Sequence, residues 1–277
     1  MKPITSTNRF WAYLLLAAAM LAGTSCDLLE FSPNDHRVPE EFTNLTQKNL
    51  ARLLARPLPP EDTLRFVFTG DSQRFYDEAD DLVKSVNQRP GVQFVLLAGD
   101  VSDFGTAREM RWVDEKLRRL RIPYLTVVGN HDLIGNGRAA YQQLFGALNY
   151  SFVYGDTKFT LIDTNSREYN FDGQVPNIPW MQTQLSDSEG ASRQIVMCHV
   201  PPDNEDFDPK MRYPFVQALR QTPNLALVLN GHNHSYRIGH PFGDGITYLN
   251  SDAFSERHYM VVTVWGNKQF RVERVAF

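Results

Sequence analysis

Apolar runs that stop at a glycine recur along the first half of the chain. They span Leu64 to Thr69, Val92 to Ala98 and Tyr124 to Val128, and in each case a polar residue follows the glycine. The stretches between them, at about 77–88 and 107–120, predict helices. This alternation predicts a β-α-β-α-β unit in which three parallel strands end at the same edge of one sheet.

The second half of the chain has a different pattern. Residues 150–154 and 158–163 flank Gly155-Asp156, which predicts a β-hairpin. Further apolar runs predict strands at 195–198, 225–229, 246–249, 260–265 and 269–276, the last three antiparallel, and helices at 180–185, after a proline-rich loop at 175–179, and at 208–221. Because these strands need cover on both faces, we expect a mixed α/β fold in which two mixed β-sheets pack as a central sandwich flanked by helices.

The N-terminus predicts export. Lys2 and Arg9 precede an uncharged apolar stretch at 11–22, which is too short to cross a bilayer but suits the apolar core of a signal peptide. We therefore expect residues 1–25 to be a signal peptide and the protein to reach the bacterial cell envelope.

The residues that end this stretch, Leu21-Ala-Gly-Thr-Ser-Cys26, resemble a bacterial lipoprotein box. Cleavage before Cys26 and acylation of its thiol would anchor the protein to a membrane, facing the periplasm or the exterior. The alternative is ordinary signal cleavage nearby, which leaves Cys26 as a plain cysteine or as a disulfide partner for Cys198.

Residues 26–60 predict a tether and one short helix, with Asn44 as its cap and the proline-rich stretch 56–60 as its end. The remaining residues, 61–277, fit one globular domain. Without Lys2 and Arg9, the 28 basic residues become 26 against 32 acidic ones, a net charge of −6. Because phosphate backbones bind clustered cations, this balance predicts no nucleic-acid partner and counts against an exonuclease.

Residues able to bind metal follow five of the predicted strands. Taken singly they are ordinary, because Gly-Asp after a strand is usually a turn and a lone loop His or Asn is usually structural. His232 and His234 differ: two imidazoles one residue apart on extended chain point the same way, which suits metal ligation. Asp71, Asp100 and Asn130 lie 29 and 30 residues apart, so they should meet at the carboxyl edge of neighbouring strands.

The ordered motifs resemble the calcineurin-like metallophosphoesterase family over about residues 64–262. They are Gly70-Asp71-Ser-Gln73, Gly99-Asp100-Val-Ser-Asp103, Gly129-Asn130-His131-Asp132, His199 and Gly231-His232-Asn-His234. One motif departs from the family, which usually has Asp-x-His where this chain has Asp71-Ser72-Gln73. The resemblance implies the four-layer fold of that family and a dinuclear centre of two divalent ions, either Mn, Fe, Zn or Mg.

The resemblance also implies roles for these residues. Asp100 would bridge the two ions; the ligands of one ion would be Asp71, His234 and Gln73, and those of the other Asn130, His199 and His232. The amide oxygen of Gln73 is a harder and weaker ligand than an imidazole, so its site would favour Mn-like or Mg-like ions, or lose its ion.

His131 is implied as the acid that protonates the leaving oxygen, with Asp103 positioning it. The alternatives are that His131 is only a neighbour of a ligand and that Asp103 caps the following helix. Arg74, Tyr236 and Asn165 are weaker candidates for contacts with the substrate.

These features predict a metal-dependent hydrolase of phosphate mono- or diesters. Two divalent ions and the carboxylates Asp71 and Asp100 leave a surplus of positive charge for an anionic ester and a metal-activated hydroxide, so no protein nucleophile is needed. The expected substrate is a small-molecule or lipid-linked phosphate ester. The alternative is a degenerate member in which Gln73 disables one site, leaving a lipoprotein that binds a phosphate ligand or acts as a scaffold.

Overall fold

The structure is a computed structural model that describes residues 37–58 and 63–277. Two mixed β-sheets form the centre of this part of the chain. The five-stranded sheet has the order β11 (Gln269–Ala276), β10 (His258–Trp265), β1 (Leu64–Thr69), β2 (Val95–Leu97) and β3 (Tyr124–Thr126). β1, β2 and β3 are parallel, as predicted, and β10 pairs antiparallel with β1 and β11. The predicted signal peptide and Cys26 lie outside the described residues.

The second sheet has six strands. Their order is β4 (Tyr150–Tyr154), β5 (Thr157–Ile162), β6 (Arg193–Cys198), β7 (Leu225–Asn230), β9 (Tyr248–Asn250) and β8 (Arg237–Gly239). The predicted hairpin of β4 and β5 is confirmed. The prediction of an antiparallel strand at 246–249 was wrong in part, because β9 begins at Tyr248 and runs parallel to β7. β8 was not predicted, since this short edge strand is partly exposed and shows no alternation of apolar residues.

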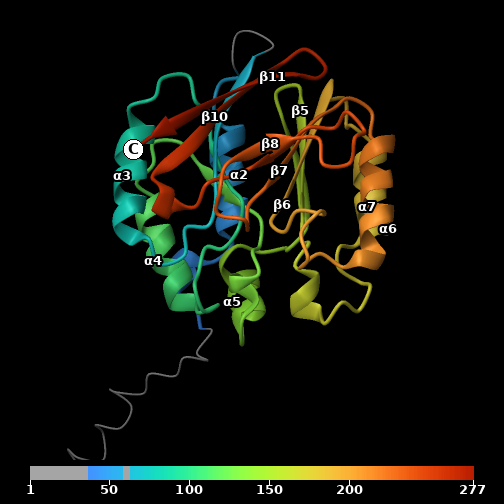
Figure 1. The fold of residues 1–277 in the computed structure, drawn as a ribbon. Coiled ribbons are helices and arrows are strands. Elements are labelled where there is room, and N and C mark those ends of the chain that lie inside the picture. The colour runs from blue at the N-terminus through green and yellow to red at the C-terminus, as the bar shows by residue number, and fades with distance from the viewer. Residues whose placement is uncertain (1–36, 59–62) are drawn as a thin grey trace, which may run out of the picture. The chain divides into compact units, whose positions relative to one another are not determined.

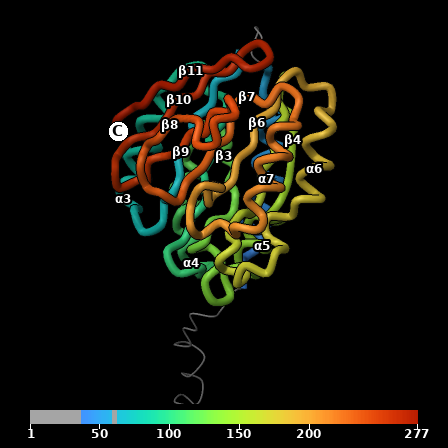
Figure 2. The backbone as a smooth tube through the Cα atoms, turned by 45° about the vertical axis from the view of Figure 1, so that its right-hand side comes forward, coloured from blue at the N-terminus to red at the C-terminus, as the bar shows by residue number. Residues whose placement is uncertain are grey.

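Helices cover the outer face of each sheet, as Figures 1 and 2 show from two directions. The five-stranded sheet is covered by α3 (Tyr76–Asn87), α4 (Ala107–Leu117) and α5 (Gly137–Leu144), and the six-stranded sheet by α6 (Ile178–Ser186) and α7 (Pro209–Gln221). α5 was not predicted, because its first residue is Gly137 and a glycine-rich segment does not favour a helix. Among the described residues, no helix has the length and apolarity needed to span a membrane.

One further helix precedes the domain. α2 (Leu45–Leu54) contacts β3 and places Leu53 in the core between the sheets. Asn44 occupies its N-cap position as predicted, but it has left-handed backbone and its side chain makes no capping hydrogen bond. α6 also differs from prediction, because Pro179 stands in its first turn rather than in a preceding loop, and Asn177 caps it.

The side chains of β1 show how the sequence directs the layers. Phe66 and Phe68 face the other sheet, whereas Val67 between them faces the helices, as the two-residue period of a strand requires. The ring of Phe66 stacks on that of Phe94 at 5.4 Å and meets Phe159 edge-on at 5.7 Å. Burying each ring contributes about 1.5–3 kcal/mol, so this aromatic core fixes the two sheets against each other and thereby fixes the ends of their strands.

Candidate metal centre

The loops after β1, β2 and β3 meet at one edge of the five-stranded sheet. The strands end level, since Thr69 pairs with Leu97 and Leu97 with Thr126. The backbone amide of Asp71 donates to the carbonyl of Gly99 at 3.0 Å, and the amide of His131 donates to Oδ1 of Asp100 at 3.0 Å. The predicted meeting of these loops is therefore confirmed.

The second sheet delivers its histidines to the same edge. His199 follows β6 and its Nδ1 contacts the carbonyl oxygen of Ala98, which ends the neighbouring segment of the first sheet. His232 follows β7, and its backbone amide donates to Oδ1 of Asp71 at 3.1 Å. The candidate centre thus lies where the carboxyl ends of both sheets come together.

Three side chains, which we call the Asn130 site, converge on one side of Asp100: Asn130, His199 and His232. The side-chain oxygen of Asn130 lies 2.9 Å from Nε2 of His199 and 2.9 Å from Nδ1 of His232. Nε2 of His199 also lies 3.3 Å from Oδ1 of Asp100. Donor atoms at these separations match neighbouring corners of a coordination shell with bonds of about 2.0–2.2 Å.

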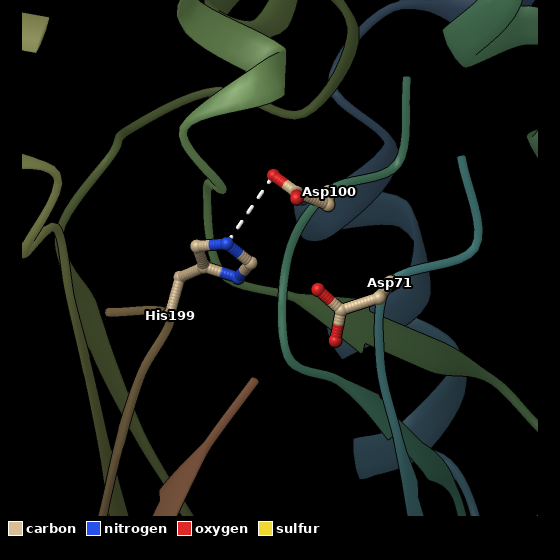
Figure 3. A group of neighbouring side chains, drawn as sticks. All are labelled: Asp71, Asp100 and His199. Carbon is tan, nitrogen blue, oxygen red and sulfur yellow. Dashed lines mark ion pairs between the residues drawn. The ribbon is translucent and has the colours of Figure 1, made fainter. Parts of the chain in front are cut away.

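The other side of Asp100 holds Asp71, Gln73 and His234, which we call the Asp71 site. Nε2 of His234 lies 3.3 Å from Oδ1 of Asp71. Ligand atoms of Asp71, Asp100 and His199 all lie within 4.8 Å of one another, and Figure 3 shows these side chains pointing into a shared space. Oδ2 of Asp71 is buried without a hydrogen-bond partner among the described residues. A buried carboxylate oxygen is costly without a partner, so this donor set fits a bound cation.

Gln73 contacts the carboxylate proposed to bridge the two ions. Its amide nitrogen donates to Oδ2 of Asp100 at 3.1 Å, with both side chains buried. The two carboxylate oxygens of Asp100 thus have different partners, with Oδ1 near His199 and Oδ2 near Gln73. In this arrangement Gln73 supports the carboxylate of Asp100.

The backbone of the centre is strained. Of the eleven non-glycine residues with positive φ in the described chain, five belong to the candidate ligands: Asp71, Gln73, Asp100, His232 and His234. Glycine is required beside them, because a Cβ on Gly129 would lie 2.1 Å from Oδ1 of Asp100. Such strain persists only where the surrounding structure holds it, and it concentrates at functional sites.

The charged groups of the centre shift one another's pKa values. Burial lowers the pKa of His199, but the adjacent charge of Asp100 outweighs burial and raises this pKa to about 10. Burial raises the pKa of Asp100, but the charge and hydrogen bond of His199 outweigh it and lower that pKa to about 2. Burial and the charge of His199 lower the pKa of His232 to about 4, and the hydrogen bond with Asp71 raises the pKa of His234. Without metal, the charge of Asp100 therefore favours the imidazolium form of His199.

His131 lies at the rim of the centre with its side chain about one third exposed. Its Nδ1 lies 2.8 Å from the backbone oxygen of Asp103, which leaves Nε2 as the nitrogen available to a substrate. The carboxylate of Asp103 is 3.8 Å from Nδ1 and pairs with Arg74 at 3.2 Å. Asp103 therefore holds His131 through its main chain. Its alternative as a helix cap was wrong, because Thr106 caps α4 in a capping box with Glu109.

Two of the weaker substrate candidates have structural contacts. The ring of Tyr236 lies under the guanidinium of Arg274 at 5.5 Å and packs against the core between the sheets. Asn165 is fully buried, and its amide donates to the backbone oxygen of Val128 at 3.1 Å and to Asp163 at 2.7 Å. These contacts tie the loop after β5 to the end of β3. The side chain of Arg74 is 66% exposed, so it is accessible to a ligand.

Two acidic residues of this edge were given no role from the sequence, although Asp132 belongs to the Gly-Asn-His-Asp motif. Asp132 is buried and accepts hydrogen bonds from Ser102 and Gly129, so it holds the loops after β2 and β3 together; burial and the charge of Asp100 raise its pKa to about 6. Its place directly after His131 was a usable signal. Asp206 lies with Oδ2 3.3 Å from Nε2 of His232, and no spacing in the sequence indicates this contact.

Curated relatives match parts of this chain at low identity. The chain is 25% identical over 175 residues to the glycerophosphodiester phosphodiesterase GpdQ of Enterobacter lignolyticus, covering 56% of this chain and 61% of that protein. It is 24% identical over 204 residues to the uncharacterized protein YvnB of Bacillus subtilis, covering 64% of this chain and 16% of YvnB. The match therefore spans less than two thirds of each of these relatives.

Solved structures share the fold. A dimetal phosphatase from Danio rerio superposes with a TM-score of 0.56 at 15% identity, over 76% of this chain and 98% of that one. A purple acid phosphatase from yellow lupin seeds gives a TM-score of 0.63 at 13% identity, over 80% and 53% of the two chains. The sequence profile of calcineurin-like phosphoesterases matches residues 64–236, which hold every candidate ligand. The chain therefore belongs to the calcineurin-like phosphoesterase family.

Proposed function

We propose that the chain hydrolyses a small phosphate ester, with phosphodiesters as the first class to test, at a pair of divalent ions that share Asp100. The observation that carries this proposal is the convergence of donor atoms from both sheets around Asp100, with Oδ2 of Asp71 buried and unpartnered. Phosphodiesters come first because one matched relative is named a glycerophosphodiester phosphodiesterase. A phosphomonoester or a lipid-linked ester is the second class.

Each group of the centre has a part in this proposal. Ions held by the Asn130 and Asp71 sites would activate water as the nucleophile and neutralise the charge of the phosphate. Asp100 would serve both sites, because its Oδ1 lies near His199 and its Oδ2 near Gln73. The four neutral ligand side chains Asn130, His199, His232 and His234 would add no charge, so the site keeps its attraction for an anion.

His131 would supply the proton for the leaving oxygen. The Asp103 carbonyl accepts the Nδ1 proton, so the ring is oriented with Nε2 free, and the imidazolium form can donate from Nε2 while Nδ1–H stays bonded. Arg74 stands beside Asp103 and could turn its exposed guanidinium to a phosphate oxygen. Neither residue would form a covalent bond with the substrate.

The test strips the domain from about residue 37 of metal and refills it with Mn²⁺, Zn²⁺, Fe²⁺ or Mg²⁺ in turn. Bis-p-nitrophenyl phosphate and p-nitrophenyl phosphate are then assayed side by side, with bound metal counted per chain. Hydrolysis that returns with two ions per chain supports the proposal, and the ratio of the two rates gives the ester class. Fewer than two ions with no hydrolysis would favour the degenerate binding protein, for which the orientation of Gln73 is the specific observation.

We also propose that the protein is exported and lipid-anchored through Cys26. The support is the charged start, apolar stretch and lipoprotein-like box of residues 1–26. Expression of the full chain in a bacterium with labelled palmitate should give a labelled, membrane-bound protein. Cys26→Ser should lose the label and release the protein from the membrane; an unlabelled wild type would reject the anchor.

A further inference from the structure

A carboxylate outside the matched motifs faces one of the candidate ligands. Asp206 lies in the loop between β6 and α7, and its Oδ2 is 3.3 Å from Nε2 of His232. On the opposite side of the same ring, Nδ1 lies 2.9 Å from the side-chain oxygen of Asn130. Both side chains of the His232–Asp206 pair are only 14% exposed. The imidazole is thus held between the Asn130 site and one carboxylate.

This placement favours one tautomer of His232 when a cation is bound. The side-chain oxygen of Asn130 and the carboxylate of Asp206 both accept hydrogen bonds, so in the metal-free protein each ring nitrogen faces an acceptor. A cation in the Asn130 site would take the lone pair of Nδ1, and the proton would then stay on Nε2, the nitrogen that faces Asp206.

Asp206 is itself fixed from two directions. Its Oδ1 pairs with Arg167 at 2.7 Å, so each carboxylate oxygen has its own partner. Its backbone amide donates to the side chain of Asn204 at 2.8 Å, and Asn204 donates to Asn233, the residue next to His232, at 2.9 Å. The loop is therefore attached to the His232 loop by side chains on both sides of the ring.

We propose that Asp206 is a positioning residue that fixes the tautomer and orientation of His232 for metal binding, with Arg167 holding the carboxylate in place. The inference rests on the proposed function, because it takes His232 as a metal ligand. A carboxylate on the distal nitrogen of a ligating imidazole orients the ring and raises its basicity, and losing such a partner typically weakens metal binding 10–100-fold.

The chain offers a matched control in the same loop. Asp203 pairs with Arg237 at 2.7 Å, and no contact with a candidate ligand is recorded for it in the described structure. Asp206→Ala and Asp203→Ala therefore each remove one carboxylate and one ion pair, but only the first removes a partner of His232. Asp206→Glu, which can restore the contact, serves as the rescue variant.

Zn²⁺ binding to the metal-free proteins is measured by competition with a chelator. Asp206→Ala should weaken one of the two sites by about 10–100-fold and leave the other unchanged, while Asp203→Ala should match the wild type at both. Asp206→Glu should recover most of the loss. Equal affinity of wild type and Asp206→Ala at both sites would overturn the proposal.

A second readout is the Nε2 proton of His232 in the Zn²⁺-loaded protein, followed by NMR. In the wild type and in Asp203→Ala this proton should exchange slowly with water, because Asp206 accepts it, whereas in Asp206→Ala it should exchange fast. Slow exchange retained in Asp206→Ala would overturn the proposal. Failure of the proposed function gives a different result: the His232 signals of the wild type would then stay unmoved when Zn²⁺ is added.

Should Asp206→Ala fail to fold, Arg167→Ala replaces it, because that side chain is 62% exposed and its loss leaves no buried gap. Freed from Arg167, Asp206 should hold the ring less firmly, so the same site should weaken about 2–5-fold, a fraction of the full effect. No change in either the Zn²⁺ affinity or the exchange rate of the His232 Nε2 proton in this variant would overturn the inference.

Discussion

The two halves of the candidate metal centre differ in how completely they are assembled. In the Asn130 site, His199 is fully buried, and the nearest nitrogens of His199 and His232 each lie 2.9 Å from the side-chain oxygen of Asn130. In the Asp71 site, the side chain of His234 is 45% exposed, and Gln73 turns its amide nitrogen toward Asp100. One half is enclosed and converged, whereas the other is more open and has an amide where the family usually has an imidazole.

The difference indicates that the two sites bind metal ions with unequal affinities. Ligands that are already converged and held by packing bind an ion with little loss of conformational entropy, whereas an exposed histidine must first be ordered. We therefore expect the Asn130 site to fill first and tightly, and the Asp71 site to fill second and weakly. The predictions below test this order, from the largest expected effect to the smallest.

Removing the carboxylate of Asp100 should abolish metal binding in both halves of the centre. Asp100→Ala takes a ligand from both halves and leaves the His199 imidazolium buried without its counter-charge. Metal content should fall from two ions per chain to none, and hydrolysis should fall to background. Full metal content by elemental analysis would contradict a bridging role.

His131 belongs to neither half, so its removal should separate catalysis from metal binding. His131→Ala should keep both ions but lower kcat by about 10²–10⁴-fold on esters with poor leaving groups, because a general acid contributes that much. With a nitrophenyl leaving group the loss should be smaller. Equal losses on both kinds of ester would argue against proton donation.

Deleting one histidine from each half compares the halves directly. His199→Ala should weaken the tight site by about 100-fold or more, because it removes a buried ligand from a converged set. His234→Ala should leave the tight site unchanged and abolish only the weak one. Calorimetric titration with Mn²⁺ distinguishes them, and identical losses in the two variants would mean that the halves are equivalent.

A rise in pH should strengthen metal binding but lower the stability of the metal-free protein. The folded pKa of His199, about 10, lies above the ordinary value near 6.5, so its ion pair stabilises the metal-free protein fully below pH 6.5 and is lost as the pH rises toward 10. The free energy of unfolding should fall by at most about 1.4 kcal/mol per pH unit in that window.

Metal must displace the same proton, so affinity should rise with pH, by about tenfold per unit for each proton released. Calorimetry at pH 7 in two buffers of different ionisation enthalpy counts those protons. A count of zero would show that His199 is neutral before metal binds, and would remove the pH effect on stability as well.

The smallest effect is expected from restoring the family's usual residue. Gln73→His replaces an amide, a weak ligand, with an imidazole, so the second ion should bind about tenfold more tightly while the first is unaffected. Gln73→Asn serves as the control that keeps an amide. An unchanged second site in Gln73→His would mean that backbone geometry, rather than the amide, limits that half.

Much of this centre could be predicted from the sequence because its chemistry follows regular elements. Asp71, Asp100 and Asn130 each come directly after a strand of one parallel unit, so strand spacing alone brings them to one edge. The contacts of Asp206 could not be predicted, because they depend on the path of an irregular loop. Likewise, sequence cannot tell whether Asp103 holds His131 through its carboxylate or, as found, through its backbone oxygen.

The ligands of the Asn130 site come from both sheets, with Asn130 after β3 and His199 and His232 after β6 and β7. An ion bound there would therefore be a cross-link between two layers that are otherwise joined mainly by the hydrophobic core between them. By mass action, free metal at a thousand times its dissociation constant adds about 4 kcal/mol to the free energy of unfolding. The supply of metal would then govern how long the folded protein survives proteolysis, as well as how fast it turns over substrate.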